Sequence, residues 1–172
     1  GLDRWAQFGE AIGTHNDQMT VGDGRVGLKH ALTWSSRPKH RLRDRQATLE
    51  SRGSVVRVAQ VGLLLLLTVA AARAREDEAL VLSAGVLFAL TVASHYYWAI
   101  VALGCLLGFS SRGPPDRLRT AVGASLGVLS TAAYYLAPLG SSEYLRWVAA
   151  DVGLLVGFLL LIGTTLRSSK VA

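Results

Sequence analysis

The chain has 172 residues, of which 51% are hydrophobic and 17% charged, and 18 Lys and Arg against 12 Asp and Glu give a net charge of +6. The charged residues crowd into the first 57 positions and into short gaps beyond them, as in a membrane protein rather than a globular one. The positive charge therefore bears on loop orientation and lipid headgroups, and we expect no nucleic-acid partner. The single cysteine, Cys105, excludes a disulfide within the chain.

Residues 1–53 are expected to be an extramembrane or interfacial segment. Its first apolar residues fall on one side of a helix, which predicts an amphipathic helix on the bilayer surface: Leu2, Trp5, Phe8 and Ile12. Gly22-Asp23-Gly24 predicts a tight turn, followed by a short element at the interface. Residues 37–57 are strongly basic and predict an exposed helical approach to the membrane.

Residues 54–172 predict a transmembrane domain. The predicted spans are 54–72, 79–93, 95–110, 120–139 and 145–166. The fold class is therefore all-α: a polytopic α-helical membrane protein with about four to five transmembrane helices and an amphipathic N-terminal segment. Arg167 and Lys170 after the last span predict a cytoplasmic C-terminus in a multi-pass protein of the cell membrane.

The stretch Ala79–Phe109 contains no Asp, Glu, Lys or Arg and leaves two alternatives open. As one helix its 31 residues would run about 46 Å, which is too long for a hydrocarbon core of about 30 Å. We favour two short helices that break at Ser94-His95, where the polar pair meets water outside the membrane. Residues 1–53 are then outside and 73–78 inside, whereas a single long helix would place residues 1–53 in the cytoplasm.

Two polar clusters could bind a substrate. His95 and Tyr96 lie in the predicted turn, where a ligand-facing role competes with that of an interfacial aromatic belt. His15-Asn16-Asp17 could bind a substrate headgroup, but it also suits a helix end. In the last span, Asp151 could pair with Arg146 or with a group on a neighbouring helix. The spacing of the histidines indicates no metal site, and no cofactor is expected.

The segment Leu90–Trp98, LTVASHYYW, lies between two apolar stretches and resembles a late segment of bacterial glycosyltransferases of the C-type fold. That segment typically has a proline where Ala93 stands, and its tryptophan precedes the histidine. The resemblance implies a polyprenyl-phosphate-linked sugar as donor, with His95 and Tyr96 lining an outward-facing cavity. No catalytic residue carries over, because nothing here matches the family's first outer loop.

Two functions follow as alternatives. The first is the C-terminal membrane portion of a sugar transferase, with the lipid bilayer, a polyprenyl-phosphate-linked sugar and the remainder of a longer chain as partners. The second is a non-enzymatic membrane scaffold, assembly subunit or transporter fragment. We expect the chain to be part of a longer protein, because its first predicted span begins only near residue 54.

Overall fold

The computed structural model describes residues 7, 22–33, 42–74, 76–94, 128, 131–136 and 143–168. Most of these residues are helical, which confirms the all-α prediction. The long helices are α4 (Gly53–Ala71), α5 (Glu76–Leu90) and α8 (Glu143–Ser168), and α3 (Leu42–Ser51) leads into α4. The short elements are α2 (Leu28–Ala31) and two strands, β1 (Arg25–Val26) and β2 (Ala93–Ser94).

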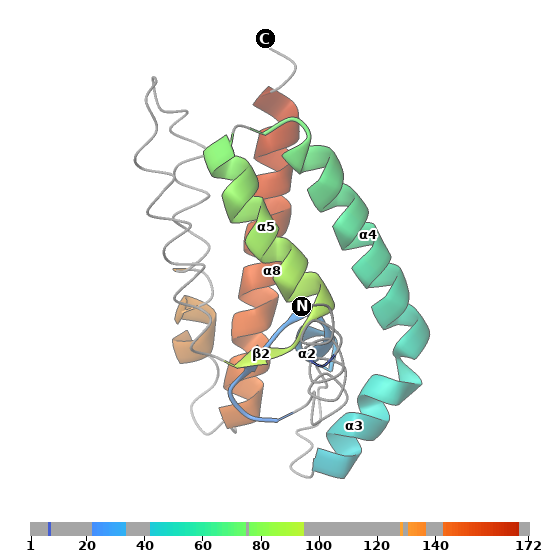
Figure 1. The fold of residues 1–172 in the computed structure, drawn as a ribbon. Helices are drawn as coiled ribbons and strands as arrows, with labels where there is room; N and C mark the ends of the chain where they lie inside the picture. The colour runs from blue at the N-terminus through green and yellow to red at the C-terminus, as the bar shows by residue number, and fades with distance from the viewer. Residues whose placement is uncertain are drawn as a thin grey trace.

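Helices α4 and α5 form a hairpin across the turn at residues 72–74, and α8 packs against both (Figure 1). Apolar side chains at helical spacing meet between the three helices, including Leu67 of α4, Phe88 of α5 and Phe158 of α8. The rings of Phe88 and Phe158 lie 5.6 Å apart. The amide of Gln60 donates to the Ala89 carbonyl oxygen at 2.8 Å, so one polar contact also joins α4 to α5.

Helix α5 ends at Leu90, and the chain then becomes extended. Strand β2 pairs antiparallel with β1, with Arg25 opposite Ser94 and Val26 opposite Ala93. The backbone of residues 93–94 thus bonds to another strand instead of continuing the helical pattern. The predicted break in the central stretch is therefore present, and α5 ends at Leu90, three residues before the predicted helix end at 93. The alternative of a single helix over 79–109 is wrong.

Two described helices, α4 and α8, are long and apolar enough to cross a membrane, and they match the predicted spans 54–72 and 145–166 within two residues. This number is below the four to five predicted. Helix α5 has 15 residues, about 22 Å, and is too short for an untilted bilayer crossing. The predicted span 95–110 lies outside the described residues, and only 128 and 131–136 of the span 120–139 are described, all helical.

The short elements and the turns lie at the two ends of the long helices (Figure 1). Helices α2 and α3 and both strands lie at the end where α4 and α8 begin, whereas the turn at residues 72–74 and the end of α8 lie at the other. Residues 22–33 therefore pack on one end of the helices, with α2 against α8 in particular. We call this the capped end.

Gly27 is required where β1 meets the end of α5. A Cβ added at Gly27 would lie 2.4 Å from the Thr91 carbonyl oxygen, which is backbone and cannot rotate away. We expect Gly27→Ala to lower the free energy of unfolding by about 1–3 kcal/mol, because the strand must shift to relieve this overlap. Gly62→Ala is the matched control, since a Cβ there meets nothing within 4 Å and alanine favours helix. Unfolding of the purified protein in detergent measures both, and equal stability of the two variants would contradict the strand placement.

Candidate functional site

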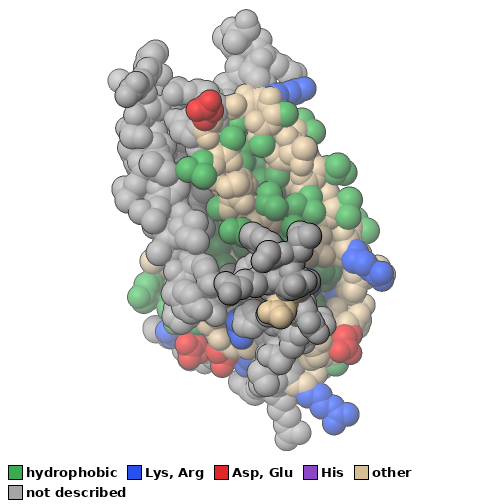
Figure 2. Space-filling model, in the orientation of Figure 1, with side chains coloured by type: hydrophobic (Ala, Val, Ile, Leu, Met, Phe, Trp, Pro, Cys, Tyr) green, Lys and Arg blue, Asp and Glu red, His purple; other side chains and the backbone are tan. Residues whose placement is uncertain are grey.

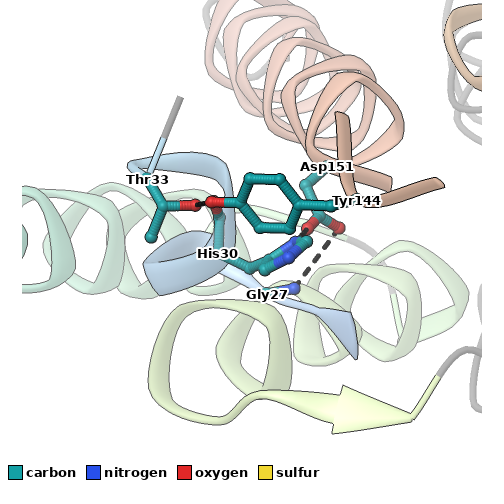
Figure 3. A network of polar contacts seen from close by, with 5 residues as sticks. All are labelled: Gly27, His30, Thr33, Tyr144 and Asp151. Carbon is teal, nitrogen blue, oxygen red and sulfur yellow. Dashed lines mark hydrogen bonds and ion pairs between the residues drawn. The ribbon is translucent and has the colours of Figure 1, made fainter. Parts of the chain in front are cut away.

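Five residues form a buried polar network between α2 and α8 at the capped end (Figure 3). This polar cluster consists of Gly27, His30, Thr33, Tyr144 and Asp151. Tyr144, Val148 and Asp151 are buried at i, i+4 and i+7 of α8, so both polar residues of α8 lie on the face that meets α2. Residues more than 110 positions apart in the chain are thus brought together.

The contact at the centre of the polar cluster joins His30 and Asp151. His30 Nδ1 lies 2.6 Å from Asp151 Oδ2, and both side chains are completely buried. The Gly27 N–H donates to the other carboxyl oxygen, Oδ1, at 3.3 Å, so both oxygens of Asp151 have partners. A carboxyl group inside an apolar helix bundle is costly unless it is hydrogen-bonded, and Gly27 and His30, at and just after the start of α2, supply these bonds.

A second contact joins the end of α2 to the start of α8. The Thr33 hydroxyl donates to the His30 carbonyl oxygen at 2.6 Å and is hydrogen-bonded to the Tyr144 hydroxyl. The His30 and Tyr144 rings meet edge to face, with centroids 5.2 Å apart. Tyr144 therefore touches both His30 and Thr33 and holds α2 against α8.

Arg45 of α3 packs against the polar cluster through the ring of Tyr144. Its guanidinium carbon lies 3.8 Å above the centre of the Tyr144 ring, and its Nη1 pairs with Asp23 at 2.8 Å. Arg45 is therefore buried, although the sequence predicted exposed arginines throughout residues 37–57. The prediction was wrong at this position because an aromatic face and a carboxylate replace the water around the guanidinium, whereas Arg43 and Arg57 are exposed as predicted.

Neighbouring groups also determine the charge of His30. Burial away from water, together with the positive charges of Arg45 and Arg25, lowers the pKa of His30 below its ordinary value. Among the described residues, no group of three or more His, Cys, Asp or Glu side chains could hold a metal ion. The polar cluster therefore offers hydrogen-bonding groups, with its histidine buried against a carboxyl group.

The site residues predicted from the sequence, His15, Asn16, Asp17, His95 and Tyr96, all lie outside the described residues. For Asp151, the structure selects a group on a neighbouring element, His30, over Arg146. The sequence analysis did not predict that His30 pairs with Asp151 or that Thr33 belongs to the same buried cluster. One signal was present, because an acidic residue within an apolar helix needs a polar partner, but the sequence does not indicate which of many polar residues supplies it.

Comparisons of this chain with protein-family models, with curated proteins and with solved structures give no match.

Replacing His30 tests the pair with Asp151. We expect His30→Leu to lower the free energy of unfolding by about 1–3 kcal/mol, because it leaves the buried carboxyl group without its side-chain partner. His30→Asn is the matched control, because its side-chain amide can reach toward Asp151 from nearly the position of Nδ1 and should recover most of the loss. Denaturation in detergent gives both values. Equal losses for the two variants would show that ring volume, rather than the hydrogen bond, stabilises this site.

Proposed function

We propose that this chain is a membrane-embedded helical unit of a multi-pass protein of the cell membrane. The observation that carries the proposal is the apolar surface of α4. Its exposed large hydrophobic side chains are Val55, Val58, Val61, Leu65, Leu66 and Val69. Val58 is 74% exposed, so α4 is not the buried core helix of a soluble protein, and lipid is the solvent that suits such a surface.

The distribution of charge supports the same proposal. In Figure 2, most hydrophobic side chains lie over the upper half of the described surface, and most charged side chains lie toward its two ends, with one basic side chain at mid-height on the right. The described arginines of α3 lie at the capped end, and Arg73 and Arg167 lie toward the other. Helix α5 can be accommodated despite its length by local thinning of the bilayer or by burial among neighbouring helices. Under this proposal the capped end lies outside and the C-terminus lies in the cytoplasm.

Within this proposal, the sugar-transferase function stands as the enzymatic candidate. One observation favours it: Ser94, which directly precedes His95 in the sequence, pairs with Arg25 at the capped end. His95 and Tyr96, which the resemblance implies as lining of the donor cavity, thus come directly after this segment in the sequence. The segment lies at the proposed outer face, where a polyprenyl-phosphate-linked sugar would be used. The alternative, a non-enzymatic scaffold or assembly subunit, predicts that these residues are dispensable.

A charge on the exposed face of α4 tests the membrane location. Val61 is 58% exposed near the middle of the helix, so Val61→Asp would be harmless in water. In a bilayer it would cost about 2.5–3.5 kcal/mol, and we expect a large fall in the protein retained by membranes after alkaline carbonate washing. Ala47→Asp, at an exposed position of α3, is the control and should be retained like the wild type. Retention of Val61→Asp equal to that of the control would contradict the proposal.

Thiol labelling in intact cells tests the orientation. In a Cys105→Ala background, Ser51→Cys places a thiol at the capped end and Ala72→Cys places one at the opposite turn, and both positions are exposed. We expect an impermeant reagent to label Ser51→Cys directly and Ala72→Cys only after the membrane is opened, because α4 separates the two positions. Labelling of both from outside would show that α4 does not cross the bilayer. The reverse pattern would invert the proposed orientation.

The transferase candidate is tested by His95→Ala. We expect loss of sugar transfer from a polyprenyl-phosphate-linked donor in membranes that contain the complete protein, at unchanged expression. Arg43→Ala, an exposed position of α3, is the control and should keep full activity. Full activity of His95→Ala would remove His95 from the site, and an absence of transfer by the wild type would favour the scaffold function.

A further inference from the structure

Arg57 is the only charged residue of α4, and its side chain is exposed near the start of that helix, at the capped end. Among the described residues, its one hydrogen bond runs from Nε to the Gly53 carbonyl oxygen at 3.4 Å, which is in the direction of the capped end. A guanidinium has five N–H donors, so the N–H groups of both Nη atoms remain available to a partner outside these residues.

The surface that follows Arg57 along α4 is apolar over the depth of one lipid leaflet. Val61 and Leu65 come at i+4 and i+8 from Arg57, so the three exposed side chains form one stripe, and Val69 continues the exposed face by another turn. Arg57 and Val69 are about 18 Å apart along the helix axis. One leaflet of the hydrocarbon core is about 15 Å deep. This face therefore combines a cation at one end with an apolar surface as long as a layer of acyl chains.

This combination selects an amphiphile with a negatively charged headgroup. A guanidinium binds phosphate oxygens through parallel N–H bonds, and its aliphatic stem can lie along apolar surface while the charged end reaches the headgroups. In a zwitterionic lipid, the cation of the headgroup competes with the protein for the phosphate. An anionic lipid has no such cation, so its phosphate charge is left for the guanidinium.

A second copy of the chain suits this face less well. Two copies packed through α4 in the same membrane orientation would bring their Arg57 side chains to the same depth, where like charges repel. Helix α4 contains no Asp or Glu that would pair with the arginine of the other copy. Helices that associate in lipid also meet mainly through small residues, whereas the exposed apolar side chains of α4 are valine and leucine.

We propose that the exposed face of α4 is a binding site for an anionic phospholipid, with the phosphate on Arg57 and an acyl chain along Val61 and Leu65. The inference rests on the proposed membrane location and adds a lipid class to it. The bond from Nε to Gly53 directs the guanidinium toward the capped end, so the site holds a lipid of that leaflet. One basic residue near a membrane surface favours anionic lipid about fivefold.

The association of spin-labelled lipids with the protein tests this proposal. The full chain is placed in phosphatidylcholine bilayers that contain a trace of phosphatidylglycerol or phosphatidylcholine with a nitroxide on its acyl chain. The motionally restricted fraction of each labelled lipid gives their relative association constants. Arg57→Gln removes the charge, whereas Arg57→Lys retains it. Arg43→Gln is the matched control, because Arg43 is also exposed but belongs to α3, outside the apolar stripe.

We expect the wild type to prefer phosphatidylglycerol, and Arg57→Gln to lower this preference about fivefold. Arg57→Lys and Arg43→Gln should keep most of it. Equal losses in Arg57→Gln and Arg43→Gln would overturn the proposal, because the preference would then belong to the basic surface as a whole. If Arg57→Gln does not fold, the wild type is measured at about 1 M salt, where the Debye length is about 3 Å, and an unchanged preference would overturn the proposal.

The same measurement separates this inference from the membrane location. Restricted lipid of both kinds without a preference in the wild type would overturn the lipid site and leave the membrane location intact. An absence of restricted lipid of either kind would contradict the membrane location itself. Disulfide cross-linking between two chains of Val61→Cys, in a Cys105→Ala background, would place a second copy on the face and would also overturn the lipid site.

Discussion

The buried contact between His30 and Asp151 is the constraint on which the capped end depends. Asp151 lies in the third turn of an apolar helix, where a carboxyl group without partners would be expensive. Its partners are Gly27 and His30, so these hydrogen bonds require residues 22–33 to lie on α8. This placement brings β1 beside the end of α5, where β2 pairs with it. One buried polar group thus determines where several otherwise weak elements lie.

The three long helices depend on a different interaction. Leu67, Phe88 and Phe158 are buried between them, while α4 also exposes six large hydrophobic side chains on its outward face. A soluble protein would cover such residues or replace them with polar ones, whereas in lipid they need no cover. Under the proposed membrane location, close packing between the helices is compatible with an apolar exterior, and the polar cluster at the capped end would lie near water and headgroups.

The sequence predicted the features that depend on local composition. Long, mainly apolar runs indicated α4 and α8 within two residues, Gly22-Asp23-Gly24 indicated the turn, and Ser94 indicated that the central stretch is not one helix. The polar cluster could not be predicted, because it depends on which residues meet in space. His30 has no metal-like spacing to another histidine, Thr33 lies in a turn, and a two-residue strand such as β1 has no periodicity to detect.

A double-mutant cycle between His30 and Asp151 tests the central claim most directly. Unfolding in detergent is measured for the wild type, His30→Leu, Asp151→Leu and the double variant. The structure predicts a coupling of about 1–3 kcal/mol, because the double variant removes both polar groups and leaves neither one buried alone. Strictly additive losses would show that the two side chains do not interact, and residues 22–33 would then have to be held on α8 by other contacts.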